Sequence, residues 1–248
     1  MKVSIITVCY NRKDTIEKAI QSVLGQNYAN IEYIIIDGNS TDGTKKVIES
    51  YRDKLSYYVS EHDNGMYDAI NKGLKVATGD IVGLMHSDDE FYDNTAIDKI
   101  VSRFIIDKSI DGVYGNGVYV SNNEKERIIR SRIGGNYNIN KLKKGWLPLH
   151  PTVYIKRSVI NKIGFYNLDF KIASDTDFLL RYLFKYQVKM SYINSYIVKM
   201  RMGGMSTNLK SVFKVLCEDY NIYKSHGLIA FQAVFLKKTI ALKQYLQH

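Results

Sequence analysis

Apolar runs of strand length alternate with segments of helical periodicity through the first 110 residues of the chain. Residues 3–9 are apolar and largely β-branched, which is typical of a buried strand. Apolar side chains then recur three and four positions apart over residues 16–24, and Gly25 ends this predicted helix. Strand, loop and helix follow one another three more times, with strands expected at residues 31–36, 55–59 and 81–85. This order predicts an α/β fold with a mostly parallel sheet flanked by helices.

Polar residues gather where each of these strands ends. The four groups are Tyr10-Asn11, Asp37-Gly38, Asp63-Asn64-Gly65 and Ser87-Asp88-Asp89. Ligands bind outside the carboxyl ends of the strands in such sheets, so we expect these groups to converge. Asp88 and Asp89 repel each other, which favours a hard divalent cation whose shell is completed by substrate phosphates. A solvated turn is the alternative, because Ser and Asp are common turn residues.

The alternation stops after about residue 110. Residues 112–120 and 127–133 are predicted to form an antiparallel hairpin around Asn122-Asn123. A Gly-, Asn- and Lys-rich stretch at 134–150 contains the only Trp and is expected to form a mobile lid or substrate loop. The remaining predicted elements are a helix at 157–163, a helix that begins near Ser174, a strand at 188–198 and two basic helices from about residue 208 onward.

Composition and charge narrow the class of protein. The chain has 248 residues, 45% of them hydrophobic, which is enough to bury a sizeable core. Its net charge of +10 favours anionic partners such as nucleotides, nucleic acid or an acidic membrane surface. Cys9 and Cys217 are the only cysteines, which indicates neither a disulfide framework nor structural zinc and fits a reducing cytoplasm.

Several patterns are missing from the sequence. No apolar run reaches the roughly 18 to 20 residues of a membrane-spanning helix, and the start of the chain does not read as a signal peptide. No G-x-G-x-x-G follows the first strand and no Walker A sequence occurs, which argues against a nicotinamide dinucleotide or a P-loop ATP site.

Taken together, these segments resemble a family 2 glycosyltransferase with the GT-A fold, over roughly residues 2–207. The matching segments are residues 3–11, residues 32–44, residues 63–73, Ser87-Asp88-Asp89 and residues 174–181. The resemblance implies a GT-A domain at 1–207, with a nucleotide-sugar-binding half at 1–110 and an acceptor half at 111–207. A C-terminal helical extension is expected at 208–248.

The resemblance also implies roles for residues at the donor site. Thr7 and Tyr10 would lie along the uracil and ribose of a UDP-sugar, and Asp37 would accept a hydrogen bond from the base edge. Asn71 and Lys72 would approach the ribose and the diphosphate. The D-x-D-type signature would correspond to Asp88 and Asp89, which would hold Mn²⁺ or Mg²⁺ against the diphosphate. His86 stands where many relatives have the first Asp, so the cation depends on Asp88 or Asp89 alone, or on both.

At the acceptor site, the resemblance makes Asp175 the base that takes the proton from the attacking hydroxyl. Asp177 is the second candidate, or it orients a neighbour. Ser174 replaces the Glu of the family's Glu-Asp pair, so the base has one carboxylate neighbour fewer to raise its pKa. Trp146 and His150 are expected near the acceptor; for His150 the alternative is a loop histidine bonded to backbone.

The sequence thus predicts an inverting, metal-dependent, non-processive glycosyltransferase. It would move a sugar from a UDP-sugar to a glycan or lipid-linked saccharide acceptor in cell-surface polysaccharide synthesis. The basic C-terminal helices predict a cytoplasmic protein in peripheral contact with the inner face of a membrane, with a solvated charged helix as the alternative. Two other functions remain open: a basic nucleic-acid-binding protein, although no nucleic-acid motif occurs, and an inactive GT-A scaffold.

Overall fold

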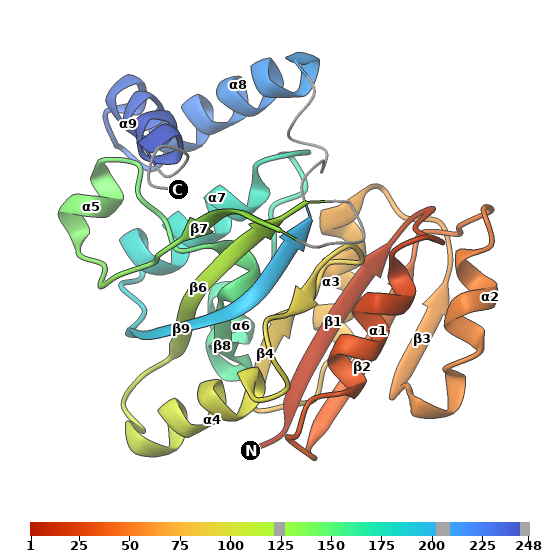
Figure 1. Cartoon of the computed structure of the whole chain (residues 1–248). Coiled ribbons are helices and arrows are strands. Elements are labelled where there is room, and N and C mark those ends of the chain that lie inside the picture. Colours follow the sequence, from red (N-terminus) through yellow and green to blue (C-terminus); the bar gives the residue numbers. More distant parts are fainter. Residues whose placement is uncertain (122–126, 202–208, 244–248) are drawn as a thin grey trace.

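A computed structural model describes residues 1–121, 127–201 and 209–243 (Figure 1). Its strands form one mixed sheet in the order β3-β2-β1-β4-β8-β6-β9-β5, with β7 paired to β6. The strands are β1 (Val3–Cys9), β2 (Ile31–Asp37), β3 (Tyr57–Ser60), β4 (Ile81–Leu84), β5 (Glu90–Phe91), β6 (Gly112–Val120), β7 (Ile128–Arg132), β8 (Tyr154–Lys156) and β9 (Met190–Arg201). The α-helices are α1 (Ile16–Leu24), α2 (Thr44–Glu49), α3 (Met66–Val76), α4 (Ala96–Ile106), α5 (Ile139–Lys143), α6 (Arg157–Ile163), α7 (Ser174–Leu180), α8 (Leu209–Ser225) and α9 (Ala230–Lys243).

The first half of the sheet is parallel, as the alternating sequence predicts. β1 pairs in parallel with both β2 and β4, and β2 pairs in parallel with β3. The register places Cys9 beside Asp37 and Asp37 beside Ser60, so three strands end at the same edge. The polar groups that follow these strands therefore share one edge of the sheet.

Hydrophobic side chains form a core on each face of the sheet. On one face, Ile6 and Ile34 belong to a buried cluster with α3, α6 and α7. On the other face, Ile5 and Ile35 belong to a cluster with α1, α2 and α4 (Figure 1). Successive residues of a strand point to opposite faces, so strands that are apolar throughout supply both cores.

The second half of the sheet is mixed. The predicted hairpin is confirmed, because β6 and β7 are antiparallel with Tyr119 opposite Arg130. Its expected turn at Asn122-Asn123 lies outside the described residues. β8 inserts between β4 and β6 and is antiparallel to both, whereas β9 runs parallel to β6. The sequence does not predict β8, whose three residues are too few for a periodic signal.

The stretch at residues 134–150 differs from the expected mobile loop. It contains α5, and Leu142, Leu147 and Leu149 in it are buried. Packed leucines anchor this segment to the core, so the sequence prediction of a lid is wrong for its second half.

The two predicted C-terminal helices are confirmed as α8 and α9, which lie together beside α7 and the β6–β7 hairpin (Figure 1). Ile222 of α8 and Ala233 of α9 are buried in the same cluster as Phe178 of α7. The boundary expected at residue 207 is itself outside the described residues and stays a prediction. Nowhere in the described part of the chain is a helix long and apolar enough to cross a membrane.

Candidate active site

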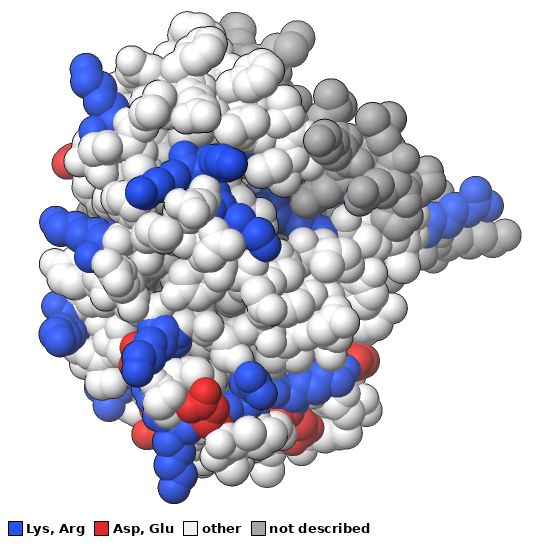
Figure 2. All heavy atoms as spheres, turned by 90° about the vertical axis from the view of Figure 1, so that its left-hand side faces the viewer, with Lys and Arg blue, Asp and Glu red and all other residues white. Residues whose placement is uncertain are grey.

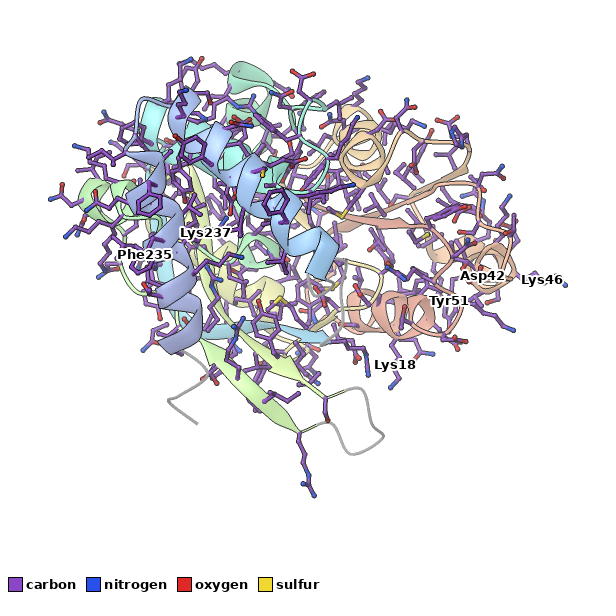
Figure 3. All side chains as sticks on the ribbon, turned by 90° about the horizontal axis from the view of Figure 1, so that it is seen from above. Lys18, Asp42, Lys46, Tyr51, Phe235 and Lys237 are labelled. Carbon is purple, nitrogen blue, oxygen red and sulfur yellow. The ribbon has the colours of Figure 1, made fainter. Side chains whose placement is uncertain are left out.

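One end of the site is built from the loops that follow β1 and β2. The Asn11 amide donates to Ser40 Oγ at 2.8 Å, and the Thr41 amide donates to Asn11 Oδ1 at 2.9 Å. The Lys13 amide donates to Asp42 Oδ2 at 3.0 Å, and Asp42 is labelled in Figure 3. These bonds hold the two loops together at the carboxyl edge of the sheet.

An exposed aromatic ring and a carboxylate flank Gly38 at this end. The Tyr10 side chain is 60% exposed, so its ring is available to a ligand. A Cβ at position 38 would collide with the Asp63 carboxylate and would stand 3.4 Å from the Tyr10 ring. Gly38 therefore lets the Asp63 carboxylate and the Tyr10 ring lie close to the backbone that follows β2.

Thr7 and Asp37 are both fully buried, so neither side chain lies at the surface of the site. The Thr7 hydroxyl is 3.1 Å from the Tyr33 hydroxyl. The Asp37 carboxylate accepts hydrogen bonds from the Ser40 amide at 3.0 Å, from the Ser40 hydroxyl and from the Ser60 hydroxyl at 2.5 Å. A nucleotide that contacted Thr7 or Asp37 would compete with these hydrogen bonds. The predicted contacts of both residues with a nucleotide stay predictions.

Asn71 and Lys72 are also occupied by protein groups. Asn71 Nδ2 donates to the Tyr166 carbonyl at 2.9 Å, and its Oδ1 accepts from the Tyr166 amide at 3.0 Å. Lys72 Nζ lies 2.8 Å from Glu61 Oε1 and donates to the His62 carbonyl at 2.8 Å. Asn71 therefore joins α3 to the Tyr166 segment, and the predicted donor contacts of both residues stay predictions.

The other end of the site lies around His86, which follows β4 and whose ring centroid is 6.1 Å from that of His150. Burial lowers the pKa of His86, while the nearby carboxylates of Asp88 and Asp175 oppose this effect. Both carboxylates thus lie within electrostatic reach of one imidazole, although they are far apart in the sequence. The roles that the family resemblance implies for Asp88 in metal binding and for Asp175 in catalysis stay predictions.

Asp88 and Asp89 have different surroundings. Asp88 is partly exposed, whereas Asp89 is buried. Burial and the neighbouring Asp88 charge raise the pKa of Asp89 well above its usual range, and a hydrogen bond from the Arg201 amide opposes them. A cation at this turn would relieve the repulsion between the two carboxylates, so the pair fits a divalent metal. Among the described residues, no three His, Cys, Asp or Glu side chains converge into a fuller metal site.

Asp175 is half-buried at the start of α7. Its Oδ1 accepts a hydrogen bond from the Thr176 amide at 2.8 Å and lies 3.4 Å from the Tyr67 hydroxyl. The Tyr67 hydroxyl also donates to the Ile172 carbonyl at 2.8 Å. Arg132 of β7 interacts electrostatically with the same carboxylate. Burial lowers the pKa of Arg132, and the charge of Asp175 opposes this effect by a smaller amount.

The sequence did not single out Tyr67 or Arg132. Tyr67 stands on a helical face that looks like ordinary core, and Arg132 lies in a hairpin without a recognisable motif. The only available signal was the alternation within residues 127–133, which could not show that Arg132 reaches α7.

His150 and Trp146 have separate environments. His150 is buried, and its Nε2 lies 2.6 Å from the Tyr166 hydroxyl instead of bonding to backbone. Burial lowers its pKa to about 4, with the Asp175 charge opposing, so the ring is neutral at pH 7. The Trp146 ring is half-buried against Tyr114, with ring centroids 6.1 Å apart. Their predicted acceptor contacts stay predictions.

Asp177 points away from Asp175. Residues two apart on a helix lie on nearly opposite faces, and Asp177 is buried toward α8. Its Oδ1 lies 3.0 Å from His226 Nε2, and its Oδ2 lies 3.6 Å from Arg181. This position favours a role in joining α7 to α8 and does not favour the predicted contact with the acceptor.

The sequence of the chain is similar to those of known glycosyltransferases. The model of the family Glycosyl transferase family 2 matches residues 4–214. An uncharacterized glycosyltransferase of Mycobacterium tuberculosis is 32% identical over 184 residues, which cover 72% of this chain and 68% of that protein. The Escherichia coli UDP-Glc:alpha-D-GlcNAc-diphosphoundecaprenol beta-1,3-glucosyltransferase WfaP is 28% identical over 99% of this chain and 95% of its own length.

Solved structures show the same fold. Residues 1–349 of Staphylococcus aureus TarS in complex with UDP-GlcNAc align with a TM-score of 0.70 and 21% identity, covering 90% of this chain and 65% of that one. Glucosyl-3-phosphoglycerate synthase of M. tuberculosis, in complex with Mn²⁺, UDP and phosphoglyceric acid, aligns with a TM-score of 0.65 and 16% identity, covering 92% and 79%. The expected GT-A fold is confirmed.

Proposed function

The chain belongs to glycosyl transferase family 2, and we propose that it moves one sugar from a UDP-sugar to a saccharide or lipid-linked acceptor. The structural observation that supports this proposal most directly is a series of contacts that links Asp175 through Tyr67, Tyr166 and His150 to His86, two residues before Asp88. The names of two similar proteins point the same way: WfaP is named for UDP-Glc and a diphosphoundecaprenol acceptor, and TarS was solved with UDP-GlcNAc.

At the donor end, the uracil stacks on the exposed Tyr10 ring above the buried Asp37, and the diphosphate extends toward Asp88. Asp88 and Asp89 would hold Mn²⁺ or Mg²⁺, which would neutralise the charge that develops on the departing UDP. Arg132 adds a fixed positive charge on the Asp175 side of the same space.

At the acceptor end, Asp175 takes the proton from the acceptor hydroxyl while that oxygen forms its bond to the anomeric carbon. The bond from this carbon to the phosphate oxygen breaks, and its electron pair leaves with UDP. Burial lowers the pKa of His150 to about 4, so its ring is neutral at pH 7 and does not form an ion pair with the Asp175 carboxylate. One displacement with one base inverts the configuration at the anomeric carbon.

We also propose that the enzyme works at the inner face of the membrane, where a lipid-linked acceptor would be held. α8 and α9 carry exposed Phe213, Phe231 and Phe235, which suit peripheral contact with lipid. On the face shown in Figure 2, Lys and Arg side chains are scattered and form no continuous stripe, which does not favour nucleic acid as the partner.

The decisive experiment is a screen of nucleotide sugars with Mn²⁺ or Mg²⁺, using a diphosphoundecaprenol-linked sugar as acceptor and NMR of the product's anomeric carbon. Asp175→Asn is expected to lower transfer by about 10²- to 10⁴-fold and to keep UDP binding. Asp88→Asn is expected to abolish the metal dependence of UDP binding. The matched control is Asp169→Asn, an exposed carboxylate shortly before α7.

Two results would contradict the proposal. A wild-type enzyme that neither binds nor uses any nucleotide sugar would exclude the function itself. Full transfer by Asp175→Asn would exclude Asp175 as the base while leaving the function standing.

A further inference from the structure

Residues of α8 and α9 form hydrogen bonds with the backbone before Asp175 and with the side chain of the residue that follows it. The two helices lie side by side next to α7 and α5 (Figures 1 and 3). Gly145, directly before Trp146, packs against the backbone of Ala233 in α9 so closely that a Cβ would collide with it. The C-terminal helices therefore contact both the catalytic helix and the segment expected at the acceptor.

Glu218 of α8 binds the segment that precedes α7. Its Oε1 accepts a hydrogen bond from the Lys171 amide at 3.0 Å, and its Oε2 accepts from the Ile172 and Ala173 amides, both at 2.9 Å. A carboxylate that receives three successive backbone N–H groups fixes the path of that backbone, because any shift lengthens several charge-assisted bonds at once.

The segment held by Glu218 leads directly to the Asp175 carboxylate. The Ile172 carbonyl accepts from the Tyr67 hydroxyl, which lies 3.4 Å from Asp175 Oδ1. Ala173, whose amide Glu218 binds, directly precedes the first residue of α7. Movement of this backbone would carry Asp175 with it and would separate it from Tyr67.

A second set of bonds holds the residue after Asp175. Thr176 Oγ1 donates to the fully buried Asp219 at 3.1 Å. Lys237 of α9, labelled in Figure 3, lies 2.7 and 2.8 Å from the two Asp219 oxygens and 2.9 Å from Thr176 Oγ1. This network ties α7, α8 and α9 together on the side away from the sheet.

We infer that Glu218 is a positioning residue, which sets the location of the Asp175 carboxylate by holding the backbone from Lys171 to Ala173. The inference rests on the proposed function, because it assigns the effect to the base of the transfer reaction. It also assigns the C-terminal helices to the catalytic machinery, in addition to any contact with a membrane. A displacement of about 1 Å at a reacting group can lower a rate by about 10²-fold.

The test compares Glu218→Ala and Glu218→Gln with Glu49→Ala, which removes an exposed glutamate from α2. Glu218→Ala is expected to lower kcat by about 10- to 100-fold while the KM for the nucleotide sugar changes less than about twofold, since the donor base would bind at the loops after β1 and β2. Glu218→Gln keeps the shape and one acceptor oxygen, so its loss of kcat is expected to be smaller. Glu49→Ala is expected to match the wild type.

Amide hydrogen exchange of the ligand-free protein provides a readout independent of activity. In both Glu218 variants, the amides of residues 171–173 are expected to exchange at least about tenfold faster, while β1 and β4 keep wild-type protection. Unchanged exchange at these amides, or an unchanged kcat in an active enzyme, would overturn the inference. If the wild type transfers no sugar, the proposed function fails, and the exchange data still decide whether Glu218 holds this segment.

Discussion

Two fully buried tyrosines differ in whether the hydroxyl has a partner. The Tyr182 hydroxyl donates to the Gly164 carbonyl at 2.7 Å, whereas the Tyr154 hydroxyl has no hydrogen-bond partner among the described residues. A buried polar group without a partner costs about 1 to 3 kcal/mol, and a typical hydrogen bond contributes about 1 kcal/mol.

Tyr154→Phe is therefore expected to raise the free energy of unfolding by about 1 kcal/mol, and Tyr182→Phe to lower it by about 1 kcal/mol. For a chain of this size, each change corresponds to a shift in Tm of about 2 to 4 °C, measurable by calorimetry. The two variants remove the same atom from the same residue type, so each serves as the control for the other. Equal shifts of the same sign would show that the Tyr154 hydroxyl does have a partner.

At the scale of elements, Glu32 joins β2 to β1 and to the turn before β4. Its carboxylate accepts from Ser4 Oγ at 2.6 Å, from the Thr78 amide at 2.7 Å, and from the Lys2 ammonium. Burial alone raises the pKa of Glu32, but the hydrogen bonds from Lys2, Ser4 and Thr78 outweigh it and bring the pKa to about 2. The unfolded chain has a Glu pKa of about 4.3, so the folded state favours the charged form.

Glu32→Gln is expected to lower the free energy of unfolding by about 2 to 3 kcal/mol at pH 7. Because the folded pKa lies below the unfolded one, this contribution is complete above about pH 4.3 and is lost as the pH falls toward 2. Denaturant titrations of both proteins at several pH values should show the difference shrinking over that range. Glu49→Gln, an exposed position on α2, should show little difference, and a pH-independent effect of Glu32→Gln would refute the assignment.

At the scale of the whole molecule, exposed aromatic side chains lie on α9. Phe231 and Phe235 are 77% and 59% exposed and are four residues apart on one face of the helix; Figure 3 labels Phe235. Lys237 of the same helix is turned to Asp219 instead, so the aromatic side chains are not part of the network around α7. Exposed aromatic rings near lysines suit the interface of an anionic membrane.

The double variant Phe231→Ser/Phe235→Ser is expected to bind vesicles containing anionic phospholipid about tenfold more weakly than the wild type in a sedimentation assay. Ile106→Ser removes a side chain that is 74% exposed at the end of α4, far from α9 in Figure 1, and should leave binding unchanged. If the double variant binds as tightly as the wild type, α9 does not contact the membrane through these rings.

The alternation of apolar runs predicted the parallel half of the sheet because β1 to β4 and the helices between them have clear local periodicity. The β6–β7 hairpin and the two C-terminal helices were also predicted for this reason. β8 was missed, since Tyr154–Lys156 is short and owes its place to pairing with β4 and β6. The lid expected at residues 134–150 was partly wrong, because the burial of Leu147 and Leu149 depends on distant partners.

The sequence by itself determined the fold class and the group of polar residues at the carboxyl edge, since these follow from periodicity and from residues close together in the chain. It also indicated the family, through the resemblance of several segments to family 2 glycosyltransferases. Tertiary structure decided which side chains are free to act there. In the folded chain, Asn71 binds Tyr166 and Asp177 lies against His226. Arg132 and Tyr67 lie near the Asp175 carboxylate, and Glu218 binds the backbone that precedes it. Such roles depend on hydrogen bonds and charges between residues distant in the chain, and no local pattern records those pairings.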